Sequence, residues 1–222
     1  MIGKVHRLSL RIGDRFSGRG LHHTCQDLER VARDTQTTVA TIARPNYWIR
    51  TVSVLAILVL VAAVVSIGPA VASGAEGFTW LTWVEAAVEV SNLLIFLSVA
   101  IYFLWSLDVR LKRRRAIAAL NGLREVAHVI DMHQLDKDPD SVLKTTAPTE
   151  HSPKRDLSPG ELGRYLDYCS EMLSLVGKLG FLYVAGVSDP EVAREANDLE
   201  SLCTGLSRKI WQKIMILRES AG

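Results

Sequence analysis

Two long apolar runs, residues 48–68 and 84–107, constrain what this chain can fold into more than any other feature. The first run is interrupted only by Arg50 near its start, and the second half of the second run is uncharged. A helix needs about 20 predominantly apolar residues to cross a hydrocarbon core roughly 30 Å thick. Because backbone amides find no water inside lipid, such runs must be helical when they lack the alternation of barrel strands. The two runs therefore predict two membrane-spanning helices.

The positions of the basic residues predict how these spans are oriented. The loop between them, residues 69–83, contains no lysine or arginine, whereas Arg44 and Arg50 flank the start of the first span. Basic loops stay on the cytoplasmic side of a membrane. We therefore predict a multi-pass hairpin over residues 47–107 in a bacterial inner membrane, with both termini in the cytoplasm. Membrane lipid is the first expected partner, and five basic residues after the second span are expected to anchor it to anionic head groups: Arg110, Lys112, Arg113, Arg114 and Arg115.

Composition and motifs exclude several classes of function. The formal net charge of +2 at pH 7 is too small to indicate a nucleic-acid partner. The three cysteines are odd in number and widely spaced, which predicts reduced thiols in a cytosolic compartment. The sequence contains no Gly-rich phosphate loop, no GxSxG motif and no Ser/His/Asp set suited to nucleophilic catalysis. We therefore expect a protein that is not an enzyme and needs no cofactor.

Outside the spans, hydrophobic periodicity predicts cytosolic helices. Residues 1–20 are basic and contain several Gly and Ser, so we expect a mobile tail, the alternative being a segment that lies against lipid head groups. Residues 21–46 predict an amphipathic or coiled-coil helix, and residues 108–135 a helix that continues the second span. Residues 136–157 predict a linker, because they are rich in proline and poor in apolar side chains. Residues 158–222 predict a helical hairpin.

Two capping boxes define that last hairpin. Ser158 precedes a proline and is followed by Glu161, so its hydroxyl can accept an orphan amide while the glutamate reaches back. Ser188 and Glu191 repeat the pattern before the final helix. The hairpin is too thin to fold alone. It would bury its apolar stripe against the helix predicted over residues 108–135, the amino-terminal helix or a second subunit. The predicted fold is therefore all-α, a two-span transmembrane hairpin with a cytosolic helical bundle and coiled-coil extensions.

Carboxylates at the start of the second span are the first candidate functional residues. Glu85, Glu89 and Asn92 share one helix face. Ionisable groups inside a span are costly, and they usually face a protein interior or a water-filled cavity. In an oligomer this face would form rings of carboxylate that attract or bind cations at a pore mouth. The alternative is that Glu85 lies in the head-group region and Glu89 reaches outward or bonds to a serine.

A second candidate site lies before Pro139. His128 and Asp131 are three residues apart and can face one ligand, whereas His133 lies about 140° around the helix from His128. Together these three residues suggest metal binding or pH sensing, provided that the helix unwinds before the proline. The alternative is that each histidine is a packed residue with a satisfied hydrogen bond. No CxxC or HExxH pattern accompanies them.

Three strings, HVIDMHQLDKDP, YLDYCSEMLSL and SRKIWQKIMIL, resemble those of an uncharacterised bacterial family of two-span membrane proteins with a cytosolic helical bundle. The overall plan is similar to that of two-span effectors in nucleotide-second-messenger defence systems. This resemblance supports a class of protein and adds no activity, and the chain lacks a recognisable nucleotide-binding domain. The thin hairpin that needs partners and the acidic face of the second span instead lead us to expect a homo-oligomeric membrane module in which cytosolic helices sense a ligand or partner and the spans respond as an effector or a cation-conducting pore. The alternative is a non-catalytic adaptor that anchors a soluble protein partner to the membrane through its cytosolic helices.

Overall fold

The computed structural model describes residues 1–43, 47–73, 80–139, 143, 150–151 and 157–219. The fold is all-α, as predicted, and the described part of the chain contains no strand. The labelled helices are α1 (Ile2–Phe16), α2 (Gly20–Ala43), α3 (Tyr47–Ser73), α4 (Trp80–Leu135), α6 (Pro159–Gly186) and α7 (Pro190–Glu219). They belong to two compact units, one made of Met1–Ala43 with Arg113–Gly222 and the other of Arg44–Lys112.

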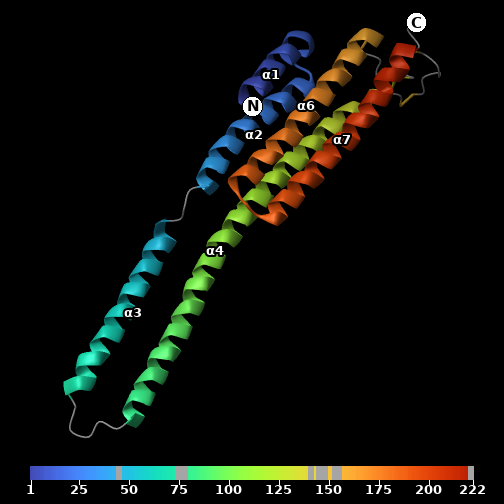
Figure 1. Cartoon of the computed structure of the whole chain (residues 1–222). Helices are drawn as coiled ribbons and strands as arrows, with labels where there is room; N and C mark the ends of the chain where they lie inside the picture. Colours follow the sequence, from blue (N-terminus) through green and yellow to red (C-terminus); the bar gives the residue numbers. More distant parts are fainter. Residues whose placement is uncertain (44–46, 74–79, 140–142, 144–149, 152–156, 220–222) are drawn as a thin grey trace. The chain divides into compact units, whose positions relative to one another are not determined.

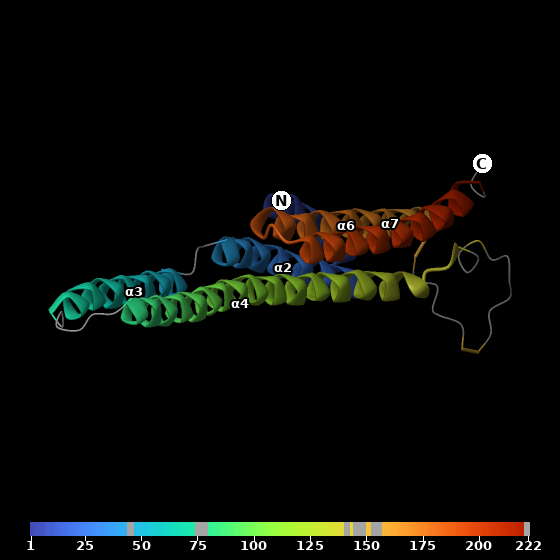
Figure 2. The same cartoon turned by 60° about the horizontal axis from the view of Figure 1, so that its bottom comes forward.

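The first unit is a bundle of α1, α2, residues 113–135 of α4, α6 and α7 (Figures 1 and 2). Contacts along the helices give their directions. Tyr165 of α6 donates a hydrogen bond to the carbonyl of His133, whereas Gly180 of α6 lies beside Leu120, so α4 and α6 are antiparallel. Arg113 pairs with Asp189 before α7 begins, and Lys213 near its end bonds to the carbonyl of Gln134, so α4 and α7 run parallel.

One hydrophobic core runs through this bundle. Each helix contributes side chains at steps of three and four residues, as expected for an apolar stripe turned inward. The stripe on α4 is Ala116, Leu120, Leu123, Ala127 and Ile130, and all five are buried. The α6–α7 hairpin thus packs on both α4 and the amino-terminal helices, which are two of the three partners that the sequence allowed.

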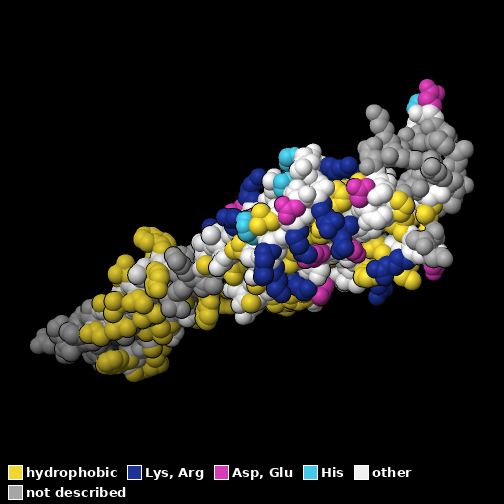
Figure 3. Space-filling model, turned by 90° about the horizontal axis from the view of Figure 1, so that it is seen from above, with side chains coloured by type: hydrophobic (Ala, Val, Ile, Leu, Met, Phe, Trp, Pro, Cys, Tyr) yellow, Lys and Arg dark blue, Asp and Glu magenta, His cyan; other side chains and the backbone are white. Residues whose placement is uncertain are grey.

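The second unit contains α3 and residues 80–112 of α4. Within the described residues, one helix is long and apolar enough to cross a membrane, the segment Trp83–Leu135 of α4. None of its most apolar stretch is buried inside the structure, and large hydrophobic side chains cover the surface there, among them Ile95, Phe96 and Val99 (Figure 3). Residues 48–68, predicted as the first span, lie within the helix α3. Of the predicted loop, residues 69–83, the structure has 69–73 in α3 and 80–83 in α4, and residues 74–79 lie outside the described residues.

The amino terminus differs from its prediction. We expected a mobile tail over residues 1–20, whereas the structure forms α1 there and buries Val5, Leu8, Ile12 and Phe16. These apolar residues lie on one face because they are spaced by three and four positions. The chain then turns into α2 through Gly18, whose φ of 73° is a conformation that favours glycine.

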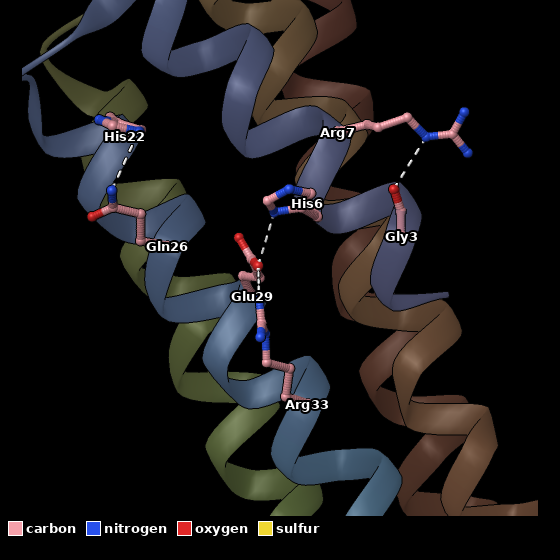
Figure 4. A network of polar contacts seen from close by, with 7 residues as sticks. All are labelled: Gly3, His6, Arg7, His22, Gln26, Glu29 and Arg33. Atoms are coloured by element: carbon pink, nitrogen blue, oxygen red, sulfur yellow. Dashed lines mark hydrogen bonds and ion pairs between the residues drawn. The ribbon is translucent and has the colours of Figure 1, made fainter.

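A polar network also joins α1 to α2 (Figure 4). His6 of α1 lies 3.0 Å from a carboxylate oxygen of Glu29 on α2, and the same carboxylate accepts a hydrogen bond from Arg33. The Arg33 and His6 contacts keep the pKa of Glu29 below its ordinary value although partial burial opposes this. The contacts of α1 with α2 are therefore both apolar and polar.

The helix caps of the α6–α7 hairpin agree with the sequence at one end only. The Ser158 hydroxyl accepts the amide of Glu161, whose side chain in turn accepts the Ser158 amide, which confirms the first capping box. At α7 the cap is Asp189 instead of Ser188, because the Asp189 carboxylate accepts the amides of Glu191 and Val192. Proline is favoured at the first helical position, so Pro190 makes the residue directly before it the cap.

Candidate functional site

A cavity of about 490 Å³ lies where the end of α4 meets the turn between α1 and α2. Its volume falls within the usual range of small-molecule sites. Arg19 comes from the turn, Gly20 is the first residue of α2, and Tyr165 comes from α6. The remaining lining residues belong to α4 and the chain after it: Val129, Met132, His133, Asp136 and Lys137. The cavity thus combines cationic, aromatic and apolar groups from three parts of the chain.

His133 forms one wall of this cavity and packs tightly against α2. A Cβ added to Gly20 would overlap the His133 imidazole, so the ring and the first residue of α2 are in close contact. Burial, followed by the positive charge of Lys137, lowers the pKa of His133. Because its pKa lies below the ordinary value, His133 is predominantly neutral at pH 7 and offers a hydrogen-bonding nitrogen without a charge.

Two cations flank the cavity. The Arg19 guanidinium lies 5.8 Å from the centre of the Phe16 ring, and the Lys137 ammonium lies 6.0 Å from the centre of the Tyr165 ring. Both distances fit cation–π contacts. Within the described residues, neither side chain forms a salt bridge, although Asp136 also lines the cavity. The cavity can therefore accept a ligand that carries negative charge and a planar or apolar part.

A buried polar cluster, which sequence reasoning missed, lies next to the cavity. Gln134 is only 2% exposed, and its amide donates to Asp131 at 2.5 Å. Lys213 of α7 donates to the Gln134 carbonyl at 2.8 Å, and this carbonyl, in the last turn of α4, also accepts the backbone amide of Lys137. Burial lowers the pKa of Lys213, and Asp138 and Asp131 oppose this change. The side-chain oxygen of Gln134 lacks a partner in the described part of the chain.

The structure separates the three residues of the predicted metal or pH-sensing site. His128 is exposed, Asp131 bonds to Gln134, and His133 faces Gly20. All three residues could face one ligand only if the helix unwound before Pro139, whereas α4 stays helical through Leu135. Among the residues that the structure describes, no group of three His, Cys, Asp or Glu side chains could hold a metal ion. Only His133 belongs to the cavity.

The candidate pore residues lie in the other unit. Glu85, Glu89 and Asn92 are all exposed on α4, among apolar side chains that are exposed as well. Ser91, next to them, bonds to the carbonyl of Ala87 four residues earlier. The polar face is therefore not covered by the residues that the structure describes.

The basic residues after the second predicted span have different surroundings. Arg110, Arg114 and Arg115 are exposed, and Lys112 pairs with Asp108 at 3.0 Å. Arg113 instead pairs with the start of α7, where it lies 2.8 Å from Asp189 and 2.7 Å from Glu191. Within a run of arginines, the sequence does not indicate which residue forms an ion pair with another helix.

Comparisons with known proteins give no assignment. No protein-family model matches the chain, and neither a curated protein nor a solved structure matches it significantly.

Proposed function

We propose that this protein is a homo-oligomeric integral membrane effector of a bacterial inner membrane, with both termini in the cytoplasm. Its cytosolic bundle binds a ligand or partner, and its two-span hairpin, α3 with the first part of α4, responds by conducting cations. The protein is not an enzyme in this proposal. The exposed Arg110, Arg114 and Arg115 hold the inner end of the second span at anionic lipid head groups.

The observation that carries this proposal is the composition of α4. One uninterrupted helix, Trp80–Leu135, is apolar and exposed in its first part and supplies a buried stripe to a folded bundle in its last part. An exposed apolar surface of this length is stable in lipid but not in water. The same helix also forms part of the cavity that holds His133. A ligand in the cavity therefore contacts the element that enters the membrane.

The acidic face of α4 supports oligomerisation. Ionised carboxylates on a lipid-facing surface are costly, whereas the same groups facing a water-filled cavity between subunits are solvated. Glu85 and Glu89 lie one helical turn apart and are both exposed. Packing of several copies around this face would remove the two carboxylates from lipid and line an entrance that attracts cations.

Ion flux from liposomes tests the proposal. We expect the purified full-length protein, reconstituted in liposomes, to release K⁺ faster than Cl⁻, and Glu89→Gln to reduce the ratio of the two rates. Glu125→Gln is the matched control, because Glu125 is exposed on α4 within the bundle and not within the apolar segment. Absence of flux under all conditions, or an equal effect of both substitutions, would exclude the conducting form of the proposal.

A second candidate function is an adaptor that anchors a soluble protein partner. Exposed Trp211 and Met215 on α7 favour it, because aromatic and methionine side chains are enriched at protein interfaces. They line a shallow surface depression of about 730 Å³ together with Arg208, Gln212, Ile216 and Glu219. Affinity capture of the full-length protein and of Trp211→Gln distinguishes this function: an adaptor loses a specific partner on substitution while ion flux stays absent in both forms.

A further inference from the structure

A second cavity of about 680 Å³ lies between α1 and α6, away from the cavity that holds His133. Four of its lining side chains are cationic, and a single one is a carboxylate. The cations are Lys4, Arg7, Arg11 and Lys178; the remaining lining residues are Leu10, Glu171, Ser174 and Leu175. We call this cavity the basic groove.

The basic groove exists because α1 and α6 are antiparallel neighbours. Arg11 pairs with Glu171 across the two helices, which fixes the register between them. Lys4 and Arg7 precede Arg11 by seven and four residues on α1, so they lie along the same face of the helix. Lys178 follows Glu171 on α6 by seven residues and lies on the corresponding face of that helix. The groove therefore has cations on both of its sides.

Most of this positive charge is not compensated by the described residues. Glu171 is paired with Arg11, whereas the Arg7 guanidinium donates only to the backbone carbonyl of Gly3, at 3.1 Å (Figure 4). Lys178 donates to the neutral hydroxyl of Ser174 at 2.8 Å, and Lys4 forms no salt bridge within the described part of the chain. Like charges three and four residues apart on a helix repel one another. A bound polyanion would remove this repulsion.

We propose that the basic groove binds a compact ligand with at least two clustered phosphate groups. Guanidinium groups bind phosphate oxygens with two parallel hydrogen bonds, and lysine adds a compact point charge. Arg7 lies on one side of the groove and Lys178 on the other, so two phosphates of one ligand can engage both helices. Exposed Leu10 and buried Leu175 provide an apolar surface beside the charges. This site does not depend on whether the protein conducts ions.

Two classes of ligand carry clustered phosphate groups: a soluble polyphosphorylated compound and a phosphorylated lipid head group. A single monoanion fits less well, because Glu171 already neutralises one of the four cations and three remain. A long nucleic acid fits less well too, since a cavity of this size encloses only a small molecule or head group. The shared feature is clustered phosphate charge, which inorganic tripolyphosphate supplies in its simplest form.

Calorimetric titration of the full-length protein in a neutral detergent with inorganic tripolyphosphate tests the proposal. We expect saturable binding that weakens as ionic strength rises. Arg7→Gln combined with Lys178→Gln should weaken it about tenfold or more, since charge-assisted hydrogen bonds on both sides are removed. Both side chains are exposed, so the double variant should retain its helicity. Lys209→Gln is the control, because Lys209 is exposed on α7 outside the groove.

The same titration in vesicles identifies the source of the ligand. If phosphatidylinositol phosphate in phosphatidylcholine vesicles competes with tripolyphosphate for the wild-type groove, a lipid head group is the ligand. If it does not compete while tripolyphosphate still binds, the ligand is soluble. Both results support the proposal. Absence of saturable binding would overturn it. So would a Lys209→Gln variant that loses half or more of the binding free energy lost by the double variant, because it removes one charge where the double variant removes two, and binding would then follow net charge alone.

Discussion

Asp189 stabilises two separate contacts with one carboxylate. One of its oxygens accepts the amides of Glu191 and Val192 at the start of α7, and the other accepts a hydrogen bond from Arg113 of α4. The Asp189 side chain is 4% exposed, whereas that of Arg113 is 35% exposed. A buried carboxylate is stable only when its hydrogen-bonding capacity is satisfied. The residue thereby fixes where α7 begins and where it meets α4.

The stability of the bundle should depend on the ionisation of Asp189. Burial opposes ionisation, but the Arg113 hydrogen bond and the two amides outweigh it and lower the pKa of Asp189 below its ordinary value. A lowered pKa contributes stability that is fully present above the unfolded pKa of about 3.9 and is lost as pH falls through the lower folded value. We expect Asp189→Asn, which keeps a cap but no charge, to destabilise the protein by about 1 kcal/mol at pH 7. Urea unfolding followed by circular dichroism measures this difference.

The pH series separates the charge of Asp189 from its size. As pH falls below about 4, wild type should approach Asp189→Asn in stability, because protonation removes the charge that the variant lacks. Asp189→Ala should lose a further 1–2 kcal/mol, roughly, at every pH, since it has no cap. A difference between wild type and Asp189→Asn that stays constant from pH 7 to pH 3 would show that the Arg113 ion pair contributes nothing.

At the scale of single elements, α1 gives a matched test of its packing. Leu8 is fully buried, whereas Leu10 on the same helix is 55% exposed. Leu8→Ala should destabilise the docked helix by about 2–5 kcal/mol through lost burial and a cavity, and Leu10→Ala should change stability by about 0.5 kcal/mol or less. Hydrogen exchange of the α1 amides measures both effects. Equal and fast exchange in wild type and both variants would mean that residues 1–20 are a mobile tail after all.

The elements that the sequence predicted best are those with local signals. Ser158 and Glu161 define the start of α6 within four residues, and a local hydrogen-bond pattern of this kind needs no tertiary contact. In α1 the four buried apolar residues are separated by basic residues, Gly and Ser, so the helix gains its stability from docking onto the bundle. At α7, Ser188 and Asp189 are both residue types that favour the cap position. The cap is Asp189, which also pairs with Arg113, a residue distant in the sequence.

The candidate sites were less predictable, because their residues come from distant parts of the chain. The cavity at His133 combines Arg19, Lys137 and Tyr165, and no spacing within the sequence relates them. The basic groove lies between one face of α1 and one face of α6. The sequence indicates each face separately but does not indicate that the two faces are neighbours. Glu85 and Glu89, by contrast, could be selected as candidates from the sequence alone, because charged residues are rare within an apolar run of this length.

At the scale of the whole molecule, α4 is the one described helix that belongs to both units. The boundary between the units falls after Lys112, where Lys112 pairs with Asp108 on one side and Arg113 pairs with Asp189 on the other. A rigid helix transmits rotation as well as displacement, because each residue is fixed at about 100° from the next. If the bundle controls the spans through α4, ion flux must depend on how the two parts of α4 are rotated relative to each other about the helix axis.

Insertions after Lys112 test this coupling while leaving both ion pairs intact. Two inserted alanines rotate the two parts of α4 by about 200° relative to each other, whereas seven rotate them by about 700°, which is within about 20° of the original phase. We therefore expect the seven-residue insertion to retain most of the cation flux from liposomes and the two-residue insertion to lose most of it, although the longer insertion moves the parts farther apart. Circular dichroism should show both proteins to be helical. Equal flux through the two proteins would exclude rotational coupling along α4, and a greater loss with seven alanines would indicate that length, not phase, governs the response.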